Sequence, residues 1–180
     1  RCVGLLAKYG KHQREVWRGI SFLLREQERN GSWFGRWGTN YIYGTWSVLE
    51  AFRLAKFDMQ HASVRRAVKW LESVQRDDGG WGETNDSYLD TGLAGQFPQT
   101  STAFQTAWAV LGLMAAGEVA SEAVRKGINY LLQQQSPEDH LWEDPWFTAP
   151  GFPRVFYLRY HGYCKFFPLW ALARYRAMTR

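Results

Sequence analysis

A recurring segment constrains the fold of this chain more than any other feature of its sequence. Three stretches align at their ends: "GISFLLREQERNGSW" (residues 19–33), "AVKWLESVQRDDGGW" (67–81) and "GINYLLQQQSPEDHLW" (127–142). In the first two, Gln stands six positions and Gly two positions before the final Trp. The third is one residue longer and has His140 where Gly is expected. Structural repeats stack on their neighbours to bury a shared core, so we expect one domain of similar units over residues 1–180.

Each unit is long enough for a pair of helices. The stretch "SVRRAVKWLESVQ" places Val64, Val68 and Leu71 at three- and four-residue steps, which predicts an amphipathic helix with Ser63 as its N-cap and a stop at the DDGG turn. Three further stretches are apolar on most sides and predict buried helices: "YIYGTWSVLEAFRLAKF", "QTAWAVLGLMAAG", closed by Gly117, and "FFPLWALARY". Outer amphipathic helices that alternate with inner apolar ones predict an all-α fold, an α/α-toroid of helix pairs.

The distribution of charge, Cys and His argues against several kinds of partner. The formal charge of +5 comes from Lys and Arg scattered along the chain, so we expect a solvated surface and no nucleic-acid partner. A weak attraction to acidic lipid headgroups stays open. Cys2 and Cys164 lie far apart, which predicts free thiols, and the four His residues do not group at metal-ligand spacings. We therefore predict no metal and no cofactor, and no stretch is long enough for a transmembrane helix.

Four blocks of the sequence resemble a known family. They are "GSWFGRWGTNYIYGTW", "QRDDGGWGE", "STAFQTAWAVLGLMAAGE" and "PGFPRVFYLRYHGYCKFFPLWALARYRA". With the QxxxGxW spacing, they are similar to the carboxy-terminal part of bacterial squalene-hopene cyclases, which belong to the terpene cyclases. The resemblance implies that each repeated Gln braces the end of an outer helix against the neighbouring Trp and backbone. It also implies squalene as substrate, the remainder of a larger cyclase chain as partner, and a peripheral or monotopic position on the cytoplasmic side of the cell membrane.

The chain is unusually rich in aromatic residues, with ten Trp, nine Tyr and eleven Phe making up 17% of it. A cyclase of this kind must stabilise carbocations in a dry pocket, and an aromatic face attracts a cation without trapping it as a nucleophile would. The resemblance implies that Trp37, Phe152 and Phe156 stabilise cations. It assigns the wall of the substrate site to Tyr43, Tyr157, Leu158, Tyr160 and Tyr163. From spacing alone these side chains also fit ordinary core packing, and for Tyr157 and Tyr163 both interpretations stay open.

The sequence departs from the family pattern in several places. The family's proton donor lies in a DxDD motif, which does not occur in these residues, so we expect the acid upstream and no activity from this segment alone. A turn explains Asp77 and Asp78, and we expect Glu83 to cap a helix or form an ion pair at the surface. Ala103 and Phe104 replace the Pro and Ser that are common in the family.

Two other functions remain as alternatives. The first is a non-catalytic α/α-toroid scaffold or stabilising partner. The second is a toroid like those of prenyltransferase subunits, which ranks last because no zinc ligand set or phosphate cradle is visible. Three helix pairs form about half of a toroid, so we expect exposed apolar faces unless the rest of a cyclase covers them. The sequence fixes neither the product nor the choice between squalene and oxidosqualene.

Overall fold

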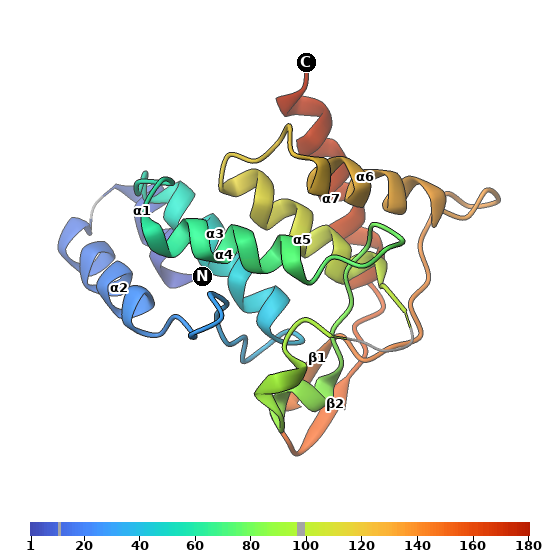
Figure 1. The fold of residues 1–180 in the computed structure, drawn as a ribbon, viewed down its shortest axis with the longest axis horizontal. Helices are drawn as coiled ribbons and strands as arrows, with labels where there is room; N and C mark the ends of the chain where they lie inside the picture. The colour runs from blue at the N-terminus through green and yellow to red at the C-terminus, as the bar shows by residue number, and fades with distance from the viewer. Residues whose placement is uncertain (11, 97–99) are drawn as a thin grey trace.

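A computed structural model describes residues 1–10, 12–96 and 100–180 of the chain (Figure 1). The described part is mostly helical, which confirms the expected all-α class and its toroid arrangement of helix pairs. Its helices are α1 (Cys2–Tyr9), α2 (Gln13–Arg25), α3 (Tyr41–Leu54), α4 (Ala62–Ser73), α5 (Ala103–Ala115), α6 (Glu122–Gln133) and α7 (Tyr163–Met178). Two 3-10 helices, η1 (Asn85–Tyr88) and η2 (Thr91–Leu93), and two strands, β1 (Ala149–Phe152) and β2 (Phe156–Leu158), complete the described elements.

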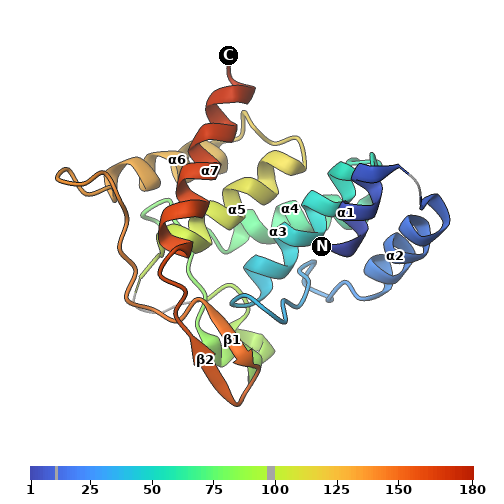
Figure 2. The ribbon, with the colours of Figure 1, turned by 180° about the vertical axis from the view of Figure 1, so that it is seen from behind.

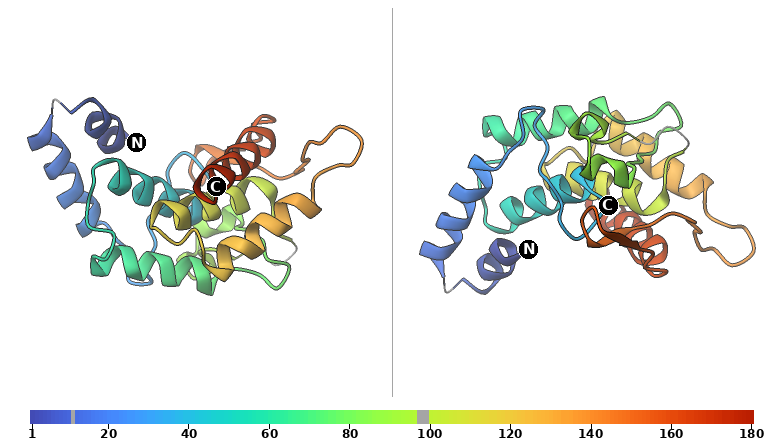
Figure 3. Two further views of the ribbon diagram at one scale, coloured as in Figure 1. Left: turned by 90° about the horizontal axis from the view of Figure 1, so that it is seen from above. Right: turned by 90° about the horizontal axis from the view of Figure 1, so that it is seen from below.

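The helices form two rows. Seen from above, α2, α4 and α6 lie in an outer row, and α1, α3, α5 and α7 lie in an inner row (Figure 3). Helix α5 packs between α3 and α7, and every residue of it is buried. Its apolar sequence follows from this position, because a helix with neighbours on all sides has no face for charged residues. In the outer helix α4, by contrast, Lys69 and Glu72 are exposed and Val68 is buried.

The ends of two helices differ from the sequence expectations in detail. Helix α4 begins at Ala62, and His61 is its N-cap because its Nδ1 accepts a hydrogen bond from the Ser63 amide at 3.2 Å. The prediction of Ser63 as the N-cap was therefore wrong, since Ser63 is buried inside the first turn. Helix α5 ends just before Gly117, whose positive φ of 92° reverses the chain as expected.

The inner helix α7 was expected to be buried, and for one of its faces this is wrong. Phe166 and Leu169 are 69% and 64% exposed, and Trp170 is 40% exposed. The opposite side, with Cys164 and Ala171, packs on the core. No helix among the described residues covers the exposed face, as expected for an incomplete toroid. In the same described ranges, none of the helices is long and apolar enough to cross a membrane.

A short antiparallel hairpin interrupts the helical pattern. Strands β1 and β2 pair Ala149 with Leu158 and Phe152 with Phe156, and they lie below the start of α7 (Figure 2). Arg154 turns the chain between them with a positive φ of 69°. No strand was predicted here, because the segment is short and rich in Gly and Pro. The hairpin matters because it carries several of the predicted site residues.

Candidate active-site wall

The repeated Gln side chains make the same hydrogen bond in all three units. Each Nε2 donates to the backbone carbonyl of the residue two before the repeated Trp: Gln27 to Gly31 at 2.8 Å, Gln75 to Gly79 at 2.8 Å and Gln135 to His140 at 2.7 Å. Two of them also reach the first turn of the next outer helix, since Gln27 donates to Ser63 and Gln75 to Ala123, at 2.7 and 3.0 Å. These two Gln residues therefore join neighbouring units.

The left-handed backbone before each Trp explains the Gly residues and their replacement. Gly31 and Gly79 have φ values of 98° and 84°, and His140 adopts 58° at the equivalent place. A Cβ on Gly31 would lie 2.7 Å from the Arg66 carbonyl oxygen of the next outer helix, and one on Gly79 would meet Lys126 in the same way. In the third unit no further outer helix follows within the described chain, so a side chain fits and only the backbone strain remains.

The repeated Trp residues bind the helix of their own unit. Their indole Nε1 donates to a carbonyl in the last turn of the preceding outer helix: Trp33 to Leu23 at 2.7 Å, Trp81 to Leu71 at 2.8 Å and Trp142 to Leu131 at 2.7 Å. All three rings are buried. Carbonyls at a helix end lack amide partners, so each indole satisfies a group that would otherwise be buried without a hydrogen bond.

Two buried carboxylates cap the inner helices. Glu83 accepts hydrogen bonds from the amides of Asn40, Tyr41 and Ile42 at 3.2, 3.1 and 2.9 Å, at the start of α3. Its expected place at the surface was wrong, because the residue is only 3% exposed, although capping was one of the two roles expected for it. Burial raises the pKa of the Glu83 carboxyl, and the amide hydrogen bonds oppose that rise.

Asp144 has the same role one unit later. It accepts hydrogen bonds from the amides of Ala103 and Phe104, at 3.0 and 3.3 Å, at the start of α5. Burial raises its pKa to about 6. Both acids stand two residues after a repeated Trp, in "WGE" and "WED". This shared position is a signal in the sequence that could have identified both caps.

The predicted site residues fall into two groups in the structure. The first lies at the hairpin end of the molecule. The rings of Phe152 and Phe156 are 5.9 Å apart between centroids, and Tyr157 stacks on Tyr88 of η1 at 6.1 Å. Trp37 belongs to the loop before α3, which the Tyr88 hydroxyl holds by donating to the carbonyls of residues 35 and 38. Within this chain the group is open, since Trp37, Phe152 and Phe156 are 52%, 54% and 46% exposed.

The second group surrounds Trp108 on α5. Tyr43 from α3 and Tyr163 from α7 lie 5.0 and 5.9 Å from the Trp108 ring, and Tyr160 stacks on Tyr163 at 5.0 Å. We call the following rings the aromatic cluster: Tyr43, Trp46, Trp108, Tyr160, Tyr163, Phe167 and Trp170. Four of these rings were not predicted as site residues, because rings on apolar helices look like ordinary core: Trp46, Trp108, Phe167 and Trp170. Leu158, the remaining predicted wall residue, is half-buried in the hairpin.

A positive group already rests on one face of the aromatic cluster. The guanidinium carbon of Arg1 lies 4.3 Å from the centroid of the Trp46 ring and 5.6 Å from that of Tyr43. Trp46 also stacks on Trp108, with centroids 6.1 Å apart and planes 6° from parallel. A cation over an indole face is attracted by about 0.5 to 2 kcal/mol. A positive charge therefore lies over the ring faces of Trp46 and Tyr43 in this structure.

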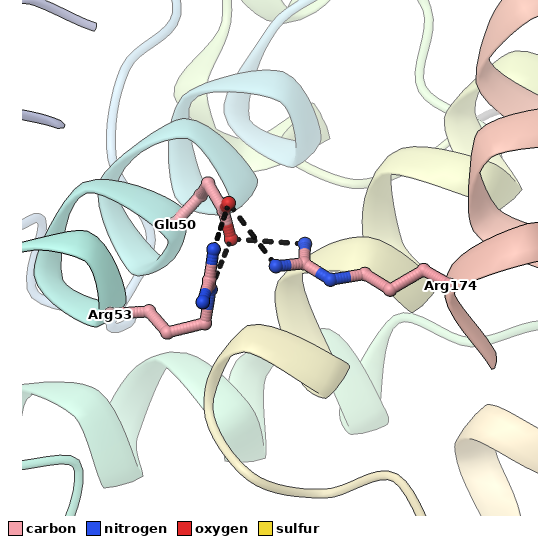
Figure 4. A network of polar contacts seen from close by, with 3 residues as sticks. All are labelled: Glu50, Arg53 and Arg174. Atoms are coloured by element: carbon pink, nitrogen blue, oxygen red, sulfur yellow. Dashed lines mark hydrogen bonds and ion pairs between the residues drawn. The ribbon is translucent and has the colours of Figure 1, made fainter. Parts of the chain in front are cut away.

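An ion-pair network fixes the position of α7 beside α3. Glu50 of α3 accepts hydrogen bonds from Arg174 of α7, at 3.0 and 3.2 Å, and from Arg53 at 2.9 and 2.7 Å (Figure 4). Burial alone would raise the pKa of Glu50, but the hydrogen bonds from both Arg side chains bring it below its ordinary value. The Arg174 and Glu50 side chains are 15% and 12% exposed, so solvent screens this pair only in part. The same Glu50 is one of the residues that line an open groove of about 370 Å³ between α1 and α3.

Comparison with known proteins identifies the family. A family model described as the squalene-hopene cyclase C-terminal domain matches residues 1–177. This chain belongs to the squalene-hopene cyclase family. It is 55% identical to squalene-hopene cyclase from Zymomonas mobilis and 58% identical to a probable squalene-hopene cyclase from Sinorhizobium fredii, with 100% and 98% of the chain aligned. The chain spans 27% of the length of each of these relatives.

The structure also matches a solved cyclase fold. With a TM-score of 0.66 and 24% identity, 91% of this squalene-hopene cyclase family chain superimposes on 28% of ent-copalyl diphosphate synthase from Streptomyces platensis. At this identity the match concerns the fold alone.

Proposed function

We propose that this chain is the carboxy-terminal part of a triterpene cyclase that converts squalene into hopene-type pentacyclic products by a carbocation cascade. The observation that carries the proposal is the aromatic cluster, whose Trp46 face holds a guanidinium at 4.3 Å. The family membership supports the same chemistry. A cascade of cations needs rings that attract positive charge and offer no nucleophile, and the inner helices, the loop before α3 and the hairpin supply them.

The predicted residues have two roles in this proposal. Trp37, Phe152 and Phe156 stabilise cations as the rings close, each by about 0.5 to 2 kcal/mol and more where water is absent. The remaining side chains hold the polyene in its folded shape: Tyr43, Tyr157, Leu158, Tyr160 and Tyr163. Tyr43 and Tyr163 both contact Trp108, which supports a place for them in one continuous wall.

The rest of the cyclase chain would close the site. Phe152 and Phe156 are half-exposed here, and a cation in that position would meet water, which quenches it. The catalytic acid is also expected outside these residues, because they contain no DxDD motif. We therefore expect the 180-residue chain alone to be inactive. The substrate is carried in lipid, so we expect the intact enzyme at the cytoplasmic side of the membrane as a peripheral or monotopic protein.

The test uses the intact protein that contains this chain. We expect it to convert squalene to pentacyclic triterpenes in a mass-spectrometric assay and to sediment with membranes, while the 180-residue chain gives no product. In the intact protein, Phe156→Ala should release partly cyclised products, because a cation formed during the cascade loses its stabilising ring. Phe22→Ala, which removes an exposed ring from the outer helix α2, is the matched control and should leave the product pattern unchanged.

The outcomes separate the alternatives. Unchanged product ratios with Phe156→Ala would remove this ring from the site. Oxidosqualene converted in preference to squalene would change the substrate and keep the mechanism. An intact protein that binds no polyene and has no upstream acid would favour the non-catalytic scaffold.

A further inference from the structure

The two segments that carry the first group of predicted rings are far apart in sequence and meet on one buried polar network. The loop of residues 33–40 carries Trp37 and leads into α3, and the hairpin carries Phe152, Phe156 and Tyr157. The Thr39 amide donates to the Thr148 carbonyl at 3.1 Å, immediately before β1. The loop and the hairpin are thus joined at their bases, and what fixes the loop also fixes the distance between the two sets of rings.

Four side chains hold the loop, and we call them the α3 anchor: Asn40, Glu83, Ser87 and Gln105. All four are at most 3% exposed. The Asn40 side chain donates to Ser87 at 3.1 Å and accepts from the Gly35 amide at 3.1 Å. Gln105 accepts from the Glu83 amide at 2.9 Å and donates to the Thr39 carbonyl at 3.3 Å. The anchor therefore contacts the loop on both sides of Trp37.

Glu83 is the charged member of the anchor and makes its densest contacts. Its carboxyl oxygens accept hydrogen bonds from three successive backbone amides, which are the free donors at the start of α3: Asn40, Tyr41 and Ile42. The positive end of the α3 dipole lies at the same place and favours negative charge there, which strengthens these hydrogen bonds. Removing the carboxylate would leave three buried amides without a partner, so the start of α3 would have to move.

The start of α3 is packed so closely against the loop before it that a movement of the helix start also moves the loop. A Cβ on Gly44, in the first turn of α3, would lie 2.1 Å from the Trp33 carbonyl oxygen, and one on Gly38 would lie 2.4 Å from the Tyr43 ring. The helix and the loop are therefore in direct contact at Tyr43. A shift of the first turn of α3 moves the Tyr43 ring and the backbone beside Trp37 together.

We propose that Glu83 is a positioning residue, which selects the product of the cyclisation by fixing Trp37 and Tyr43 relative to the rings of the hairpin. It contacts no substrate itself. The inference rests on the proposed function and adds a specificity role for a residue outside the aromatic wall. A displacement of about 1 Å in such a site changes rates by up to about a hundredfold, and the competing steps of a cascade need not change equally.

The experiment measures product ratios in the intact enzyme with Glu83→Ala and Glu83→Gln, well below the melting temperature of each variant. We expect Glu83→Ala to raise the ratio of partly cyclised to pentacyclic product by about fivefold or more. Glu83→Gln keeps the length and one oxygen that can accept the Asn40 and Ile42 amides, but its NH2 group faces the Tyr41 amide, so it should restore only part of the wild-type ratio. Ser87→Ala, which frees the Asn40 side chain, provides a milder perturbation of the same loop if either Glu83 variant does not fold.

A matched control separates positioning from stability. Gln75→Ala removes two hydrogen bonds in the outer row and should lower the melting temperature without changing the product ratio. A merely structural role for Glu83 predicts the same pattern, with fewer active molecules and an unchanged ratio. An unchanged product ratio in a folded Glu83 variant overturns the inference. A shift of the product ratio in Gln75→Ala as large as in the Glu83 variants also overturns it. A wild-type protein that cyclises no polyene overturns the proposed function instead, and the inference with it.

Discussion

The repeated indole hydrogen bond gives a stability prediction whose size follows from the structure. Trp81→Phe removes the Nε1 donor and leaves the Leu71 carbonyl, in the last turn of α4, buried without a partner. An unsatisfied buried group of this kind costs about 1 to 3 kcal/mol. Trp81 is 0% exposed, so the smaller ring also leaves a cavity, which adds roughly 1 to 2 kcal/mol. We expect the free energy of unfolding to fall by about 2 to 5 kcal/mol.

The measurement is urea unfolding of the 180-residue chain followed by far-UV circular dichroism. The midpoint should fall while the slope of the transition stays constant, because the same surface is exposed on unfolding. Trp17→Phe is the matched control, since this ring is 54% exposed on α2 and its replacement should change stability by less than about 0.5 kcal/mol. A loss for Trp81→Phe no larger than for Trp17→Phe would show that the indole bond does not brace the unit.

Two further predictions concern the third unit. The folded-state pKa of Asp144, about 6, is above its ordinary 3.8, so the folded chain binds this proton more tightly than the unfolded chain. The stability that Asp144 contributes is therefore present below about pH 4 and is lost as the pH rises through about 6. Urea midpoints measured across this range should show the loss, and the pH dependence should disappear in Asp144→Asn. An equal pH dependence in that variant would assign the effect to another group. His140→Gly relieves the strain of the left-handed backbone at φ 58° and should raise the free energy of unfolding by about 0.5 to 1 kcal/mol in the same urea assay. A decrease would mean that the His140 side chain makes a stabilising contact that outweighs the strain.

The helices could be predicted from the sequence because their apolar residues recur with the helical period and their ends carry turn residues. Val64, Val68 and Leu71 identified α4 in this way, and the burial of α5 followed from a segment with no charged face. The hairpin could not be predicted, because its strands have four and three residues and depend on contacts with η1 and the loop before α3. The Arg154 Nε donor, for example, binds the Tyr88 carbonyl, 66 positions away in the sequence, at 2.6 Å.

The site shows the same division between local and long-range information. Resemblance to a family pointed to rings such as Phe152 and Phe156, but it did not indicate which side chains hold those rings in place. Glu83 was expected to cap a helix or to form an ion pair at the surface, and the sequence did not show which helix it could cap. In the fold, its carboxylate meets the start of α3, more than forty positions earlier in the chain, and the three amides there are satisfied only by an acceptor from outside the helix.

This difference has a physical cause that extends to other repeat folds. The outer helices interact with near neighbours in sequence, so their amphipathic pattern is visible from within one unit. Helices α3 and α5 have buried N-termini, and their free amides are satisfied by the following unit, which places an acid two residues after Trp81 for α3 and after Trp142 for α5. An acid at that position in one unit therefore predicts a buried helix start in the unit before it. Tyr43 stands on α3 and Trp108 on α5, so these two contacting rings of the aromatic cluster lie on the helices whose starts the two acids hold.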